Sequence, residues 1–231
     1  MRISSGVSGF DDLVDGGFPE GRLYVVSGPP GSGKTTFCSQ FAAQGARDGD
    51  KTLYVSMHET KEGIKQDMEG YEFGFDRAVA SDRITFLDAL SSDGRRFFGK
   101  PNDRRDRNSV ANRLTGFIES RDIDRIILDS TMLLSYLLDD TEDTAVQLLT
   151  ALKRTDATTL LISEMTDPSA YSEEHYLAHG VVFMHNYLED DGMQRGLQVL
   201  KMRGTDIDTD IHDLEFGPKG LRVGAGKPVK H

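Results

Sequence analysis

The sequence predicts an α/β fold, in which a mainly parallel β-sheet is flanked by helices and carries an antiparallel edge hairpin. Apolar runs alternate with helical patterns along most of the chain, which is typical of βαβ units. Several of these runs are continuous Val, Ile and Leu, as in strands buried on both faces. The 231 residues suffice for one domain with a substantial core. Because no repeat or linker divides them, we expect one domain over residues 1–221 and a disordered tail over 222–231.

The expected elements follow one another in regular order. Strands are predicted at Leu23–Ser27, Thr52–Met57, Ile84–Leu87, Arg125–Asp129, Thr158–Ser163, Val181–His185 and Gly196–Met202. Helices with apolar residues at three- and four-residue spacing are predicted at Lys34–Arg47, Lys61–Gly70, Ser109–Arg121 and Thr141–Arg154. The acidic turn Glu189–Gly192 separates the last two strands, the first of which begins at Gly180 in this pairing, and this predicts the edge hairpin.

The segment Ser91–Asn108 is polar and rich in arginine. Phe97 and Phe98 stand among its arginines, a composition that can bind nucleic acid. Three aspartates interrupt the basic run, however. We therefore expect a mobile surface insertion.

Composition and charge exclude several classes of protein. No run of about 18 apolar residues occurs, so no membrane insertion is expected, and the N-terminus has neither the basic start nor the apolar stretch of a signal peptide. The single cysteine, Cys38, excludes a disulfide framework and fits a reducing, cytoplasmic location. A net charge of -11 repels nucleic acid and makes it an improbable partner.

Asp outnumbers Glu among the acidic side chains, 26 to 12, and Arg outnumbers Lys among the basic ones, 17 to 10. An Asp-rich, Lys-poor surface stays hydrated where salt screens charge. The composition fits a salt-rich, haloarchaeal type of cytoplasm, and it also fits an ordinary acidic bacterial or archaeal protein.

The strongest motif is GPPGSGKT at Gly28–Thr35, which lies between a predicted strand and a predicted helix. Its glycines allow backbone N–H groups to surround phosphates, Lys34 brings a positive charge to the β- and γ-phosphates, and Thr35 offers a hydroxyl to Mg²⁺. The N-terminus of the following helix faces the anion. The expected ATP-binding residues are Gly28, Pro29, Pro30, Gly31, Ser32, Gly33, Lys34, Thr35 and Thr36.

A carboxylate is needed to hold the magnesium shell. Asp129 ends the apolar strand in RIILDS, and in a parallel sheet it would emerge beside the phosphate loop. We therefore expect Thr35 and Asp129 to hold Mg²⁺. The other interpretation is that Asp129 caps the next segment.

Hydrolysis also needs a group that orients the attacking water. His58 and Glu59 follow the second strand in SMHET, and Glu59 is the candidate base. Adjacent residues of an extended strand point to opposite faces, so in extended backbone only one of them would reach the γ-phosphate. The other would be a polar residue at a helix start, where Glu59 or Thr60 is a possible cap.

Taken together, these motifs resemble the KaiC-like branch of the RecA-type P-loop ATPases over nearly the whole chain. The resemblance rests on GVSGFDDLVDGGFPEGRLYVVSGPPGSGKTTF, GYEFGFD, RIILDS, ATTLLISE and LKMRGTD. It implies a RecA-like sheet, ATP and Mg²⁺ binding, and a hexameric homo-oligomeric ring with nucleotide at the subunit interfaces. It further implies that Lys201 and Arg203 complete catalysis in trans at the γ-phosphate held by the next subunit. The alternative for this pair is a basic edge strand exposed to solvent.

Two positions depart from the family pattern. The family usually has two adjacent glutamates after the second strand, and His58 stands at the first of them. Either His58 acts as the base near neutral pH, or Glu59 takes over, or turnover is very slow. His179 stands where the family normally has Asp, and a lone histidine is more often structural than a ligand.

These observations predict a regulatory ATPase that hydrolyses ATP slowly and acts as an oligomeric nucleotide-dependent switch on an unidentified protein partner. One alternative is an ATP-binding component of a motility or signalling assembly that does not hydrolyse ATP, which His58 favours. A second is a RecA-type ATPase of DNA recombination or repair, which the net charge disfavours.

Overall fold

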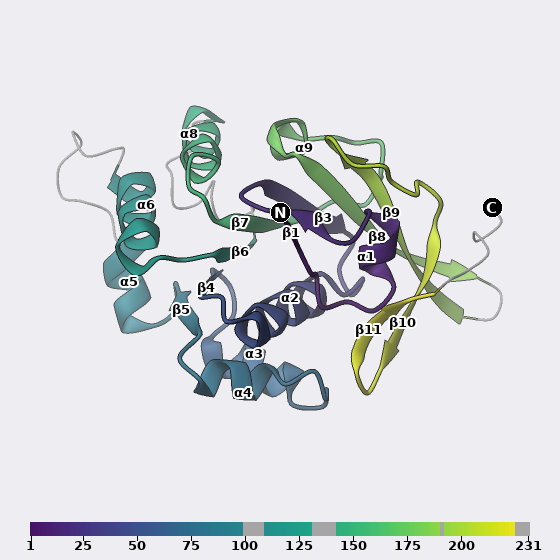
Figure 1. Cartoon of the computed structure of the whole chain (residues 1–231), viewed down its shortest axis with the longest axis horizontal. Coiled ribbons are helices and arrows are strands. Elements are labelled where there is room, and N and C mark those ends of the chain that lie inside the picture. The colour runs from purple at the N-terminus through teal and green to yellow at the C-terminus, as the bar shows by residue number, and fades with distance from the viewer. Residues whose placement is uncertain (99–108, 131–141, 190–191, 225–231) are drawn as a thin grey trace.

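A nine-stranded sheet is the centre of the described part of the chain, which in this computed structural model comprises residues 1–98, 109–130, 142–189 and 192–224 (Figure 1). The strand order is β11-β10-β9-β8-β3-β7-β6-β4-β5. Six neighbouring strands run parallel. They are β3 (Leu23–Gly28), β4 (Thr52–Ser56), β5 (Ile84–Asp88), β6 (Arg125–Asp129), β7 (Thr158–Glu164) and β8 (Gly180–Glu189).

Three further strands extend the sheet in antiparallel fashion. The predicted hairpin is confirmed as β8 and β9 (Gly192–Met202), although β8 is longer than expected. Sequence patterns missed β10 (His212–Gly217), which pairs with β9 only at Gly196 and Leu197, and β11 (Gly220–Val223), which pairs with β10. The first two residues of the expected tail therefore belong to β11, and Val223 is buried. Residues 225–231 lie outside the described part.

Helices cover both faces of the sheet (Figure 1). One face carries α2 (Lys34–Asp48), α3 (Lys61–Met68) and α4 (Phe75–Ala80), and the other carries α5 (Ser92–Phe98), α6 (Ser109–Arg121), α8 (Glu142–Leu152) and α9 (Glu173–Leu177). Alternate residues of each strand serve the two faces: Tyr24 and Val26 of β3 pack toward α2, whereas Leu23 and Val25 pack toward α6 and α8. This confirms the prediction of a parallel sheet buried on both sides.

The start of the chain forms its own small layer over α2. It contains β1 (Arg2–Ile3), α1 (Phe10–Leu13) and β2 (Phe18–Pro19), and β1 and β2 pair with each other. Phe10 and Phe18 pack against Phe37 of α2, with ring centroids 5.1 and 6.4 Å apart. The opening segment is therefore part of the core beside the phosphate loop.

The segment Ser91–Asn108 is not simply an insertion on the surface. Its first part forms α5, and Phe98 of α5 is buried in the core beneath α6. The expectation of a mobile loop is wrong for residues 92–98, because the aromatic pair Phe97 and Phe98 supplies an apolar face that packs onto Phe117. Residues 99–108 lie outside the described part of the chain.

A buried arginine fixes the strand that ends at Asp129. Arg125, at the start of β6, is 1% exposed and pairs with the carboxylates of Asp48 at 2.9 Å and Asp50 at 2.7 Å. It also donates to the carbonyl of Phe41. A buried charge is tolerated only when it is paired and hydrogen-bonded, and Arg125 meets both conditions.

Candidate nucleotide-binding site

A cleft of about 530 Å³ opens at the carboxyl ends of the parallel strands. It is lined by Pro30, Gly31, Gly33, Lys34, Thr35, Thr36, His58, Glu59, Ile64, Asp67, Met68, Tyr71, Asp129, Ile162, Glu164, Arg195 and Phe216. His58, Glu59 and Asp129 thus meet residues 30, 31 and 33–36 of the predicted phosphate loop in one cleft, whereas Lys201 and Arg203 lie elsewhere.

The loop between β3 and α2 has the backbone of a phosphate cradle. Gly33 has a φ of 106°, and a Cβ there would lie 2.7 Å from Cζ of Phe216. Gly28 lies so close to Met184 and Ser32 that any side chain would collide with them. Helix α2 begins at Lys34, as predicted. The buried Ser32 hydroxyl has no hydrogen-bond partner among the described residues, so the loop offers a polar atom to a ligand.

Lys34 is buried and held by acceptors around its ammonium group. Nζ donates to the carbonyls of Gly28 at 2.8 Å and Pro29 at 2.9 Å, and lies 3.1 Å from Oε1 of Glu164. Glu164 ends β7 and is the register partner of Gly28. Glu164 was not predicted as a site residue. Its only signal in the sequence is its position at the end of an apolar strand, and Asp129 ends an apolar strand in the same way.

We expect Glu164→Gln to bind ATP several-fold more tightly than the parent. The carboxylate competes with phosphate for Lys34 and repels a bound anion, whereas the neutral amide competes more weakly and does not repel the anion. ATP titrations of the variant and of Glu215→Gln, which changes a carboxylate away from the cleft, would test this. Equal affinities in all three proteins would contradict it.

Thr35 and Asp129 lie together at the end of the cleft. The Thr35 hydroxyl donates to Oδ2 of Asp129 at 3.2 Å, and the Tyr54 hydroxyl lies 3.5 Å from the same oxygen. Burial raises the pKa of Asp129, although His58, Thr35 and Lys34 each lower it. A hydroxyl and a buried carboxylate are oxygen donors of the kind that Mg²⁺ accepts, so these residues fit that ion.

His58 and Glu59 both line the cleft, and the extended backbone under which only one of them was expected to reach the γ-phosphate is absent at these two residues. Strand β4 ends at Ser56, so the alternation of an extended strand no longer applies at these two positions. His58 Nε2 lies 3.9 Å from Oδ1 of Asp129. Glu59 accepts from the Thr60 N–H at 3.1 Å, and Thr60 caps α3 by accepting from Gly63 N–H, as predicted.

Arg195 and Phe216 form the opposite rim, which the sequence analysis did not identify. The Arg195 guanidinium lies 4.8 Å from the centroid of the Phe216 ring and donates to the carbonyl of Gly31 at 3.3 Å. Asn186 donates to the carbonyl of Pro30. These contacts join β8, β9 and β10 to a loop more than 150 residues away in sequence, so no local pattern marks them.

Lys201 and Arg203 lie together at the carboxyl end of α9. Lys201 Nζ donates to the carbonyls of His175 at 3.0 Å and Tyr176 at 3.3 Å, and Arg203 donates to the carbonyl of Tyr176 at 3.2 Å. Burial lowers the pKa of Lys201, with smaller contributions from Arg203 and Lys153. Met202 is buried in the core, as expected from the alternation of side chains.

His179 lies among the same cations. Its Nδ1 accepts from Leu23 N–H at 3.3 Å, which is a structural role. Burial lowers the pKa of His179, and Lys153, Arg22 and Arg203 lower it further.

Acidification should therefore destabilise the fold in part through His179. Because its folded pKa lies below the ordinary 6.5, the stability it contributes is complete above pH 6.5 and is lost as the pH falls. We expect His179→Asn, which keeps an acceptor for Leu23, to lose less stability than the parent between pH 7 and 5, by a few degrees in Tm. Parallel melting curves of both proteins would contradict this.

The fold and the loop define a P-loop nucleotide-binding protein of the RecA type. A Gly-rich loop joins a central parallel strand to a helix whose N-terminus faces the cleft, and a strand-end aspartate lies beside it. The chain belongs to the KaiC family of ATPases, described as "ATPase: KaiC", which matches residues 3–227.

Individual relatives agree with this assignment. The circadian clock protein KaiC3 of Synechocystis sp. is 29% identical over 212 residues, covering 89% of this chain and 42% of the relative. The UPF0273 protein of Thermotoga maritima is 28% identical, covering 96% of this chain and 95% of the relative. The crystal structure of a KaiC-like protein from Pyrococcus horikoshii OT3 superposes with a TM-score of 0.80 at 26% identity, covering 97% of this chain and 99% of that one.

The chain spans less than half of the clock-protein relatives but nearly all of the Thermotoga protein. It therefore corresponds to one KaiC-like ATPase domain. No helix in the described ranges has the length and apolar character required to cross a membrane.

Proposed function

We propose that this chain binds ATP in the cleft, hydrolyses it slowly, and acts as a nucleotide-dependent switch within a homo-oligomeric ring. The observation that carries the proposal is the convergence of Lys34, Thr35 and Asp129 at one end of the cleft, beside a loop of backbone N–H groups. Glu59 and His58 line the same cleft. We place the protein in the cytoplasm, with one domain that includes β11 and so extends through Val223.

The phosphate loop provides binding. Backbone N–H groups of residues 31–36 would surround the β- and γ-phosphates, and Lys34 would exchange Glu164 for a phosphate oxygen. Thr35 and Asp129 would hold Mg²⁺, which would supply neutralisation of the charge on the phosphate oxygens. Phe216 offers a ring face at the rim, where a base would stack.

Glu59 activates water in the proposed reaction. Its carboxylate leaves the Thr60 N–H, accepts a proton from the attacking water, and so assists formation of the new P–O bond as the bond to the ADP oxygen breaks. Lys34 stabilises the charge that develops on the transferred group. His58, 3.9 Å from Asp129, orients the magnesium-binding carboxylate in this scheme.

Lys201 and Arg203 would act on the neighbouring subunit. They do not line the cleft of their own chain, and none of the salt bridges among the described residues involves them. Two unpaired cations in a chain of net charge -11 suit the anionic cleft of a second copy. We propose a ring, hexameric by resemblance, in which nucleotide sits between this pair and the next subunit's Lys34.

The binding proposal is tested by Lys34→Ala. Removing the ammonium group removes a charge-assisted contact, so ATP affinity should fall tenfold or more, on the order of 1.5–3 kcal/mol. Calorimetric titration with ATP and Mg²⁺ measures it. Lys51→Ala, a solvent-exposed lysine at the far end of β4, is the matched control and should bind as the parent does. Parent-like affinity of Lys34→Ala would refute the site.

A second candidate function is an ATP-dependent regulator without hydrolysis. His58 favours it, because an imidazole stands where a carboxylate base would otherwise be. Such a protein would bind ATP tightly and release no phosphate in a turnover assay. In either case the binding of the protein partner should depend on whether ATP or ADP is bound. Pull-downs carried out in the presence of each nucleotide would compare the two states.

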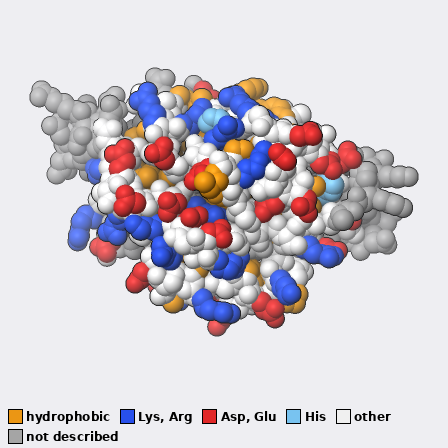
Figure 2. All heavy atoms as spheres, viewed as in Figure 1, with side chains coloured by type: hydrophobic (Ala, Val, Ile, Leu, Met, Phe, Trp, Pro, Cys, Tyr) orange, Lys and Arg blue, Asp and Glu red, His pale blue; other side chains and the backbone are white. Residues whose placement is uncertain are grey.

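DNA repair is the least supported alternative. Acidic and basic side chains are interspersed over the face shown in Figure 2, rather than gathered into a basic track. Binding to single-stranded DNA that weakens steeply with salt would revive it.

A further inference from the structure

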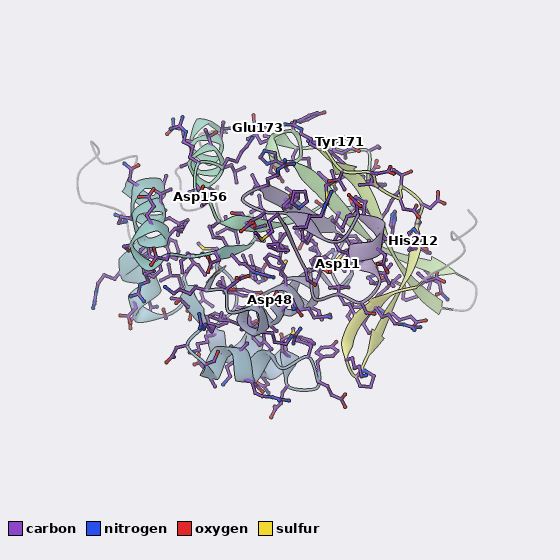
Figure 3. All side chains as sticks on the ribbon, in the orientation of Figure 1. Asp11, Asp48, Asp156, Tyr171, Glu173 and His212 are labelled. Atoms are coloured by element: carbon purple, nitrogen blue, oxygen red, sulfur yellow. The ribbon has the colours of Figure 1, made fainter. Side chains whose placement is uncertain are left out.

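Helix α9 joins the phosphate site to the cationic pair Lys201–Arg203. It is short, Glu173–Leu177, and Tyr171 and Glu173 mark its start in Figure 3. Its side chains reach the sheet in one direction, and its last carbonyls accept from Lys201 and Arg203 in the other.

Two hydrogen bonds, one buried and one partly buried, attach α9 to the sheet. His175 lies 2.7 Å from the Ser27 hydroxyl through Nε2, and Glu174 Oε1 accepts from the Ser163 hydroxyl at 2.7 Å. Ser27 and Ser163 are register partners on the adjacent parallel strands β3 and β7. They therefore lie side by side on one face of the sheet, and α9 spans both.

Those two serines directly precede the residues that meet at the phosphate site. Ser27 is followed by Gly28, the first residue of the phosphate loop, and Ser163 is followed by Glu164, which pairs with Lys34. The attachment of α9 is thus one residue away from the phosphate site on each of the two strands.

The protonation state of His175 fits this role. Its Nδ1 accepts from the Ser172 N–H at 3.1 Å, so Nε2 carries the hydrogen that it donates to Ser27. The side chain is 2% exposed, and Ser27 is fully buried. A buried neutral imidazole with both nitrogens bonded has a single orientation.

We propose that α9 positions Lys201 and Arg203 for the neighbouring subunit, and that His175 is its central positioning residue. The side chain of His175 holds the strand that leads into the phosphate loop, and its carbonyl oxygen holds Lys201. The nucleotide site of one subunit and the cations it offers to the next therefore share one support. This inference rests on the proposed trans role of the pair.

The test assigns His175 to one side of the shared site. His175→Ala should lower turnover at saturating ATP about tenfold and leave ATP affinity within about twofold of the parent. Mixed with Lys34→Ala, it should recover activity, because its own loop is intact and the partner supplies a well-placed pair. Mixed with Arg203→Ala, it should stay inactive, because both proteins then lack a working pair.

Three further proteins make the result decisive. His175→Gln keeps an N–H donor for Ser27 and should restore part of the turnover. If His175→Ala does not fold, the double variant Ser27→Ala/Ser163→Ala removes both attachments without added bulk and should behave in its place. Thr159→Val, on β7, removes a buried hydroxyl with no hydrogen-bond partner among the described residues and should behave as the parent.

Recovery with Arg203→Ala but not with Lys34→Ala, or a loss of ATP affinity that accounts for the lost turnover, would show that His175 serves only its own phosphate loop and would overturn the inference. The reference mixture of Arg203→Ala with Lys34→Ala tests the shared site between subunits independently of the role of His175. If that mixture is inactive, the shared site itself is wrong, and this inference fails with it.

Discussion

Glu59→Gln should bind ATP as the parent does and hydrolyse it roughly 100-fold more slowly, the usual scale for loss of a general base. The amide keeps the size of the side chain but takes no proton from water. In the structure the Glu59 carboxylate lines the cleft and accepts from the Thr60 N–H, and it must give up that hydrogen bond to act as the base. Phosphate release under saturating ATP and Mg²⁺ measures the effect.

Companion variants assign the role within the pair. Glu62→Gln, on the exposed first turn of α3, is the matched control and should keep parent turnover. His58→Glu should raise turnover, because it places a carboxylate where the resemblance expects one. If Glu59→Gln is as active as the parent, the base is His58 or none, and His58→Gln then decides between these two.

Arg203→Ala should keep ATP binding and lose most of its turnover, by two orders of magnitude or more, which is about the scale for a charge that stabilises a transferring phosphoryl group. Arg203 does not line its own cleft, so affinity in the subunit that carries the change is preserved. Arg222→Ala is the control. It removes a surface arginine paired with Glu215 and should leave turnover unchanged.

Mixtures of Arg203→Ala with Lys34→Ala test the shared site more directly. Arg203→Ala retains a working loop, and Lys34→Ala retains a working Arg203, so hybrid interfaces between them contain one complete site. Turnover of the mixture should exceed that of either protein alone. Sedimentation in ATP and Mg²⁺ should show an oligomer. A strict monomer, or a mixture no more active than its parts, would exclude a shared site.

Much of the fold follows from local patterns. The predicted strands agree with the structure because continuous Val, Ile and Leu runs report burial on both faces directly. The missed elements are short or mixed in character. Phe75–Ala80 is too short to show helical periodicity. His212–Gly217 contains only two large apolar residues, and the charged Asp213 and Glu215 stand beside them, so its apolar run is too weak to predict a strand.

Some residues of the candidate site could be predicted from local sequence patterns, and others could not. The phosphate loop and Asp129 were predictable because each is marked by its own strand end. Glu164 occupies an equivalent strand end, but no motif singles it out. Arg195 and Phe216 reach the loop from distant strands, and their place at the rim depends on tertiary packing that a single sequence does not encode locally.

The strand order has a consequence for how such proteins diversify. The phosphate loop follows β3, in the middle of the sheet, whereas His58 and Glu59 follow β4, which lies next to the edge strand β5. The residues expected to bind ATP and the residues expected to activate water therefore follow different strands, although they line the same cleft. We therefore expect substitutions after β4 to change the rate of hydrolysis with less effect on ATP affinity, which the His58 and Glu59 variants described above would test.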